Sequence, residues 1–307
     1  MCKTILKYDI LQEFGGIKIL RNKLNVVKRL LRVNQWIKNV FIFTPIVFAQ
    51  KVFDGRSLIK VTVAALLFCM LTSCVYILND IVDVEKDILH PKKKLRPIAN
   101  GEVSKKNALI LVSILLPIAI VCGILLDWSF GIVMVLYFCN NYLYSYFLKR
   151  KIIVDVLSIA IGFVLRVMAG AEVINVYISP WILMCTLFLA LLLGLSKRRS
   201  EILLLGQDAA QFRENLADYS IELIDNMLSV VIAVTLAAYS MYTFFSQNDT
   251  YLMILTIPSV VYGIFRYQYL VYVRHEGGMP EETILMDKPL IMTMGLWILV
   301  VAVAIYF

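Results

Sequence analysis

The chain has 307 residues, of which 60% are hydrophobic, and its mean hydropathy is +0.79. Such a composition excludes an ordinary soluble domain of this length. The net charge of +8 does not indicate nucleic-acid binding, because the basic residues do not form one patch with interleaved aromatic side chains. We therefore expect an integral membrane protein with no nucleic-acid partner.

Apolar runs long enough to cross a bilayer recur along the chain. A spanning helix needs about 20 residues, and a helix satisfies every backbone hydrogen bond within one segment. We predict an all-α integral membrane protein whose nine transmembrane helices surround a cavity that faces the cytoplasm. The predicted spans are residues 36–53, 61–78, 108–126, 130–147, 153–171, 181–195, 227–245, 251–270 and 290–307.

The placement of basic residues predicts the orientation. Most of the 30 lysines and arginines lie in the N-terminal segment and in the connections that follow even-numbered spans. By the positive-inside rule, the N-terminus is cytoplasmic and the C-terminus faces outward. We expect a multi-pass protein of the inner (plasma) membrane, and its oligomeric state stays unknown.

The first 34 residues differ from the predicted membrane domain at 35–307. Apolar residues recur at spacings of three and four from Ile17 to Leu31, with lysines and arginines beside them. This basic amphipathic pattern is typical of a helix that lies on anionic membrane lipid. A basic tail that only sets the topology is the alternative.

An acidic motif follows the second predicted span. Asp80, Asp83 and Asp87 share one face if the helix continues through them. With Asn79 they offer the hard oxygen ligands that suit Mg²⁺, which usually keeps some waters and bridges to substrate phosphates. A basic run at 90–97 follows at once, as a site for a metal and a pyrophosphate would need. A solvated helix end with a polybasic loop is the alternative.

A second polar cluster lies between the fourth and fifth predicted spans. Asn141, Ser145 and Lys149 recur at intervals of four, and Asp155 begins the next span. Two helix pairs therefore carry Asn and Asp at their cytoplasmic ends, which fits an internal duplication with two acidic corners facing one cavity. Ordinary hydrogen bonding between helices is the alternative.

Further cations lie in and after the later spans. Arg166 is about 16 Å along its helix from Asp155. An ionisable group at that depth costs at least about 2.5 kcal/mol unless it is paired or hydrated. Arg166 therefore either binds substrate or pairs with a carboxylate or carbonyl on another helix. Lys197, Arg198 and Arg199 are either a stop signal for the sixth span or a phosphate-binding group.

These motifs resemble those of a known family. Asn79-Asp80-x-x-Asp83-x-x-x-Asp87 in a chain of nine predicted spans resembles the first aspartate motif of the UbiA superfamily of intramembrane prenyltransferases. Four segments look closer to one branch, the decaprenyl-phosphate phosphoribosyltransferases. They are Leu31-Arg32-x-x-Gln35-Trp36-Ile37-Lys38-Asn39, His90-Pro91-x-Lys93-x-x-Arg96-Pro97-Ile98-Ala99, Tyr144-Ser145-x-x-Leu148-Lys149-(x)5-Asp155 and Lys197-Arg198-x-x-Glu201. Many superfamily members carry a second acid-rich motif, whereas this chain, like that branch, has Lys149 and a single Asp155.

The resemblance implies a UbiA-like, Mg²⁺-dependent enzyme that transfers 5-phosphoribose from 5-phosphoribosyl 1-pyrophosphate to a polyprenyl phosphate and releases pyrophosphate. It implies metal ligation by Asn79, Asp80, Asp83 and Asp87, and catalytic roles for Asp80, Asp83 and Asp155. Asp155 would orient a ribose hydroxyl or a water on the metal. The implied substrate-binding residues are Lys38, Asn39, Asp87, Lys93, Arg96, Tyr144, Lys149, Arg166, Lys197 and Arg198, with Lys93 and Arg96 on the leaving group.

Other functions stay open at this point. The first is a prenyltransferase that moves an isoprenoid from its diphosphate to an aromatic or lipid acceptor. The second is a transporter, which the cytoplasmic position of the carboxylates disfavours because transporters bind near the midplane. The third is a catalytically inactive assembly protein. The sequence does not give the chain length of the acceptor or the glycan that receives the sugar.

Overall fold

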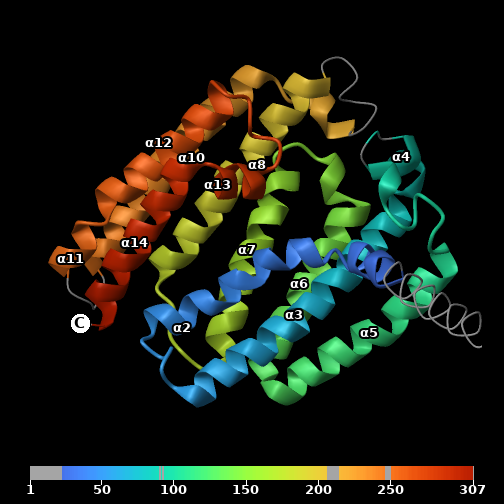
Figure 1. Cartoon of the computed structure of the whole chain (residues 1–307), viewed down its shortest axis with the longest axis horizontal. Helices are drawn as coiled ribbons and strands as arrows, with labels where there is room; N and C mark the ends of the chain where they lie inside the picture. The colour runs from blue at the N-terminus through green and yellow to red at the C-terminus, as the bar shows by residue number, and fades with distance from the viewer. Residues whose placement is uncertain (1–22, 90, 92, 206–213, 246–249, 307) are drawn as a thin grey trace, which may run out of the picture. The chain divides into compact units, whose positions relative to one another are not determined.

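The computed structural model of the chain describes residues 23–89, 91, 93–205, 214–245 and 250–306. Every regular element in these ranges is a helix (Figure 1), so the all-α class is confirmed. Most of the N-terminal amphipathic segment lies outside the described residues, but residues 23–30 of it are helical.

The elements follow one another along the chain with short connections. They are η1 (Val33–Phe43), α2 (Thr44–Phe48), α3 (Gly55–Val82), α4 (Val84–Leu89), η2 (Lys93–Leu95), α5 (Lys105–Leu126), α6 (Trp128–Tyr146), η3 (Leu148–Arg150), α7 (Val154–Val173), α8 (Pro180–Leu205), η5 (Glu214–Asp218), α10 (Ile221–Phe245), α11 (Thr250–Ile254), α12 (Ile257–Tyr272), α13 (Pro280–Met286) and α14 (Lys288–Tyr306).

Within the described residues, six helices are long and apolar enough to cross a membrane: α3, α5, α7, α8, α10 and α14. The other three predicted spans coincide with elements that fall short of this standard. The first is divided into the 3-10 helix η1 and the short α2, and the eighth is interrupted before Pro258, at the start of α12. The fourth, α6, is diluted by the adjacent polar residues Asn140 and Asn141. The count of nine spans therefore stays a prediction.

The chain divides into two compact units. Unit 1 comprises residues 1–38 and 68–120, and unit 2 comprises residues 39–67 and 121–307. Unit 1 has its own apolar core, in which Leu30, Cys74 and Ile77 pack with Ile98 and Val112. This core fixes the end of α3, and with it the acidic motif, against the loop that precedes α5.

Unit 2 is built around α7, which packs between α6 and α8, while α8 packs along α10. One of its core clusters joins residues of α7, α8, α10 and α12. Gly170 of α7 permits a close approach of the backbone at Ile42, because a Cβ at this position would overlap the Ile42 carbonyl oxygen. This approach brings the second half of η1 against α7.

Candidate functional site

The first acidic motif lies in unit 1, where α3 gives way to α4. Asn79 and Asp80 are in the last turn of α3, and Asp87 is in α4. The helix breaks at Asp83, which belongs to neither α3 nor α4. Hydrogen bonds from the Asp83 amide to the Asn79 carbonyl (2.9 Å) and from the Asp87 amide to the Asp83 carbonyl (2.9 Å) still keep helical spacing across the break.

Two arginines converge on the carboxylates of this motif. Arg32 donates to Oδ1 of Asp80, and its guanidinium lies over the ring of Tyr76 at 5.0 Å. Arg96 lies 3.0 Å from Oδ1 of Asp80 and 2.5 Å from Oδ2 of Asp87. Asp80 and Asp87 are only 2% and 3% exposed. Carboxylates at such burial are costly unless they are paired, so the arginines supply the positive charge that holds them together.

The donor atoms of the motif fit a divalent metal of the magnesium type. Oδ1 of Asn79 is buried and has no hydrogen-bond partner within the described part of the chain. Among the same residues, no three His, Cys, Asp or Glu side chains form a metal cage. Mg²⁺ does not need one, because it usually binds through one or two carboxylates and completes its shell with water and substrate phosphates. The residues therefore suit a metal that arrives with a phosphorylated substrate.

The other cations of unit 1 differ in their burial and in their partners. Lys93, in η2, and Lys38, in η1, are both half-buried. Arg96 is bonded to the carboxylates rather than presented alone, and 23% of its side chain is exposed. Arg32 received no role from the sequence, because its partner Asp80 is 48 residues away and only tertiary folding brings them together.

The second polar cluster lies in unit 2 at the start of α7. Asp155 is fully buried, and both of its oxygens accept hydrogen bonds. Arg198 donates from Nε to Oδ2 at 2.8 Å, and the hydroxyl of Tyr219 donates to Oδ1 at 2.9 Å. Arg198, only 2% exposed, also contacts Glu201 at 2.5 Å. Asp155 is therefore held by protein groups on both sides and does not present an open oxygen.

Tyr219 links this carboxylate to the backbone of the turn before α7. Its hydroxyl accepts a hydrogen bond from the amide of Ile153 at 2.8 Å while it donates to Asp155. Burial raises the pKa of the Tyr219 phenol, and the charge of Asp155 raises it further. The phenol thus keeps the proton that it donates. Sequence spacing did not reveal this residue, which lies 64 positions from Asp155.

The other predicted residues of unit 2 lie at the same end of the α6, α7 and α8 helices. Tyr144 is in the last turn of α6, and Lys149 is in η3, directly before α7. Both side chains are half-buried, whereas Lys197 is exposed near the end of α8. Lys149 and Lys197 are therefore more accessible than Arg198, which is buried.

Arg166 is buried in the middle of α7 and bonded to protein groups. Its Nε donates to Oδ1 of Asn39 at 2.9 Å, and its other nitrogens donate to the Tyr137 hydroxyl and the Gly162 carbonyl at 2.8 Å each. Arg166 and Asn39 are only 4% and 2% exposed. This geometry favours the second alternative for Arg166, pairing inside the protein, with an amide and a phenol in place of a carboxylate.

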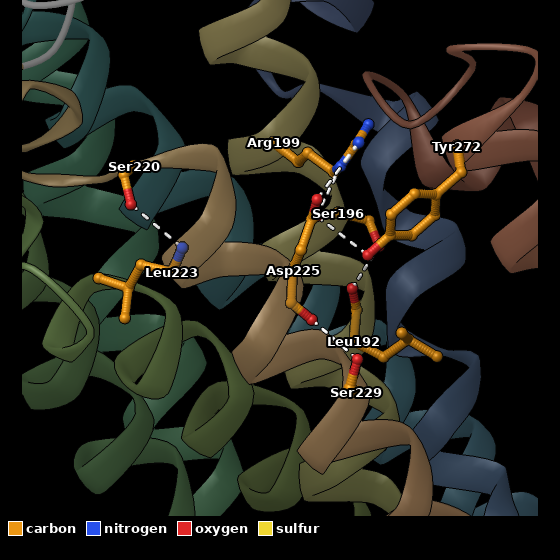
Figure 2. Close-up of polar contacts among 8 residues, drawn as sticks. All are labelled: Leu192, Ser196, Arg199, Ser220, Leu223, Asp225, Ser229 and Tyr272. Atoms are coloured by element: carbon orange, nitrogen blue, oxygen red, sulfur yellow. Dashed lines mark hydrogen bonds and ion pairs between the residues drawn. The ribbon is translucent and has the colours of Figure 1, made fainter.

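Arg199, the neighbour of Arg198, belongs to a third cluster. It lies 2.7 Å from Asp225 of α10, and its guanidinium stacks 4.1 Å from the ring centre of Tyr272. The Tyr272 hydroxyl also donates to Asp225, at 2.9 Å, so that Figure 2 shows the carboxylate reached by both residues. The roles of the run Lys197-Arg198-Arg199 as a stop signal or as a phosphate-binding group stay predictions. Both arginines form ion pairs inside unit 2, on different faces of α8.

The model of the UbiA prenyltransferase family matches residues 40–279, which is most of the chain. The chain belongs to the UbiA prenyltransferase family. Among curated relatives of this UbiA protein, a decaprenyl-phosphate phosphoribosyltransferase from Corynebacterium glutamicum is 31% identical, with 90% of this chain and 85% of the relative covered. A protein of the same name from Mycolicibacterium smegmatis is 28% identical over 94% of each chain. The predicted resemblance to this branch is confirmed.

A solved structure agrees with this assignment. The UbiA homologue from Archaeoglobus fulgidus, bound to GPP and Mg²⁺, superposes with a TM-score of 0.72 and 17% identity, and covers 92% of this chain and 100% of its own. At that identity the likeness establishes the fold alone. This UbiA protein is therefore an all-helical, multi-pass membrane protein of that fold.

Proposed function

We propose that this UbiA-family membrane enzyme transfers 5-phosphoribose from 5-phosphoribosyl 1-pyrophosphate to a polyprenyl phosphate. One observation carries the proposal: the acidic motif gathers Asp80 and Asp87, two arginines and a buried amide oxygen that has no partner among the described residues. Oxygen donors beside guanidinium groups form the combination that a metal-bound diphosphate needs. The two relatives reported above are named for phosphoribosyl transfer, which supports phosphoribose as the group that moves.

The acidic motif would bind the pyrophosphate end of the donor. Asn79, Asp80, Asp83 and Asp87 would hold Mg²⁺, which when bound supplies positive charge to the pyrophosphate. Arg96 is partly exposed, unlike the carboxylates that it contacts, so it is well placed to neutralise the leaving group, with Lys93 near it in sequence. Arg32 would remain on Asp80 and hold its orientation.

The second cluster would bind the remaining phosphate groups. Lys197 is exposed and Lys149 is half-buried, and Tyr144 lies at the same helix ends. We propose that Arg198 and Asp155 act through position rather than through contact with substrate, because each is buried against the other. Asn39 and Arg166 would brace η1 against α7, and Lys38 precedes this brace.

The reaction then depends on positioning and on charge stabilisation. The acceptor phosphate is already ionised at neutral pH, so the chain does not need a strong general base. The bound groups would hold the acceptor oxygen near the anomeric carbon of ribose while positive charge develops there. The leaving pyrophosphate would be stabilised by Arg96 as the bond to the sugar breaks.

We further propose the topology that the basic residues predict. Nine spans place the N-terminus in the cytoplasm, the C-terminus outside the inner membrane, and the cavity open to the cytoplasm. Residues 1–34 would form a separate segment on anionic lipid ahead of the membrane domain at 35–307. A reporter fused after Phe307 tests the count of spans, since cytoplasmic activity of the reporter contradicts nine.

The activity test uses purified protein in detergent or liposomes with labelled phosphoribosyl pyrophosphate and a polyprenyl phosphate. We expect a labelled lipid product and released pyrophosphate, and loss of both when EDTA removes divalent metal. A product formed only from a prenyl diphosphate and an aromatic or lipid acceptor would replace phosphoribosyl transfer with prenyl transfer. Metal-independent solute flux without any product would instead indicate a transporter.

A further inference from the structure

We propose that Tyr219 is a positioning residue, whose hydroxyl fixes both Asp155 and the turn that carries Lys149. The proposal deepens the proposed function and rests on it for the identity of the substrate. Tyr219 follows η5, in the connection between α8 and α10, and it reaches back 66 positions to the amide of Ile153. No motif of the sequence assigns it a role.

The turn before α7 has a backbone conformation that needs support. Ile153 has φ +66°, a left-handed conformation that a β-branched residue rarely adopts. Its side chain is 47% exposed, so packing of that side chain does not hold the turn. The bond from the Ile153 amide to the Tyr219 hydroxyl, together with the bond from the Val154 amide to the Ile152 carbonyl at 2.7 Å, does hold it.

The ring of Tyr219 is itself fixed. It is 5% exposed and belongs to the core cluster that contains Val156 of α7, Leu192 and Leu195 of α8, and Leu216 of η5. The packed ring therefore fixes the position of the hydroxyl oxygen, which would not shift with the turn if the turn moved. It serves two partners at once, as acceptor from Ile153 and donor to Asp155.

The hydroxyl is one member of the hydrogen-bonded group around Asp155. The second oxygen of Asp155 is already bonded to Arg198, which is bonded in turn to Glu201. Removal of the hydroxyl would take one hydrogen bond from the buried carboxylate and would remove the acceptor of the Ile153 amide. The turn would then relax, because too few contacts would remain to hold Ile153 in its strained conformation.

Lys149 would move with the turn. It lies in η3, four residues before Ile153, and the Asp155 amide is bonded to the Lys151 carbonyl at 3.2 Å, so the η3 turn and the start of α7 are continuous. Under the proposed function Lys149 would bind a phosphate of the donor, and its position would decide how well it does so. Loss of the Tyr219 hydroxyl should therefore weaken donor binding more than it slows the chemical step.

The test compares Tyr219→Phe with Tyr272→Phe. The control removes the same kind of group, a tyrosine hydroxyl bonded to an aspartate that is shared with an arginine, but in the cluster of Arg199 and Asp225 (Figure 2). We expect the KM for the donor to rise about tenfold in Tyr219→Phe, with kcat within about threefold of wild type. Tyr272→Phe should change neither constant by more than about twofold. Equal effects of the two variants, or a fall in kcat alone, would overturn the proposal.

Amide hydrogen exchange provides a readout that does not depend on the substrate. In Tyr219→Phe the peptide covering residues 148–157 should exchange at least about tenfold faster than in wild type, and in Tyr272→Phe it should not. Unchanged exchange there contradicts the positioning role whether or not the protein transfers phosphoribose. If the wild type uses a prenyl diphosphate, the proposed function fails, and the KM comparison is made with that donor instead.

Discussion

The two acidic motifs of this protein use the same residue types in different ways. In the first motif, Asp80 and Asp87 share Arg96, which is 23% exposed, and a buried amide oxygen of Asn79 lacks a partner among the described residues. In the second, Asp155 is fully buried and both of its oxygens are bonded to buried side chains. The groups of the first motif are therefore suited to bind a ligand, whereas Asp155 in the second motif is suited to hold neighbouring protein groups in position.

The largest expected effect comes from Asp83→Asn in the first motif. Asp83 is half-buried between α3 and α4, so the substitution should leave the fold intact. Loss of an anionic metal donor should lower turnover by about 100-fold or more, with a normal melting temperature. Glu85→Gln, at an exposed neighbouring position, is the matched control and should retain activity. Near-normal turnover of the Asp83 variant would contradict a metal role for the motif.

Arg96→Met tests the first motif by removing the cation that its two buried carboxylates share. The metal-free variant should lose about 1–3 kcal/mol of stability, since Asp80 and Asp87 would then repel each other with less compensation. Added Mg²⁺ should raise its melting temperature more than that of wild type, because the ion replaces the missing charge. Thermal unfolding with EDTA and with Mg²⁺ measures this difference, and an equal shift in both proteins would count against it.

A smaller effect is expected for Asp155→Asn in the second motif. The amide retains an oxygen for one hydrogen bond but loses the ion pair with Arg198. Turnover should fall by about 10-fold to 100-fold through misplacement of substrate, while the affinity for divalent metal stays within about twofold of wild type. Titration with Mn²⁺ checks the second part. If Asp155→Asn bound metal as weakly as Asp83→Asn, both motifs would contribute to metal binding, which contradicts the distinction drawn here. The Tyr219→Phe comparison proposed above tests the same motif with the smallest change, a single hydroxyl.

The sequence predicted what depends on local pattern. Apolar runs gave the helical class, because length and hydropathy decide whether a helix can span. The spacing of Asp80, Asp83 and Asp87 predicted one shared face if the helix continued, and the structure places Asp80 at the end of α3 and Asp87 in α4. The sequence left open whether the helix continues through the motif; the structure interrupts it at Asp83, although helical hydrogen bonds continue across the break.

Partners distant in sequence could not be predicted in this way. Arg32 and Tyr219 lie 48 and 64 residues from the aspartates that they bind, and neither has a local signal of its role. The run Lys197-Arg198-Arg199 shows the same limit. Three identical-looking cations have different surroundings, because successive residues project from different faces of α8.

The central claim is that the first motif binds a diphosphate together with a divalent ion. Calorimetric titration of the purified protein with 5-phosphoribosyl 1-pyrophosphate tests it most directly, with and without Mg²⁺, in wild type and in Asp83→Asn. We expect binding by wild type only when Mg²⁺ is present, and a loss of at least about tenfold in affinity in the variant. Equal affinity with and without the ion, or an unchanged affinity in Asp83→Asn, would contradict the account.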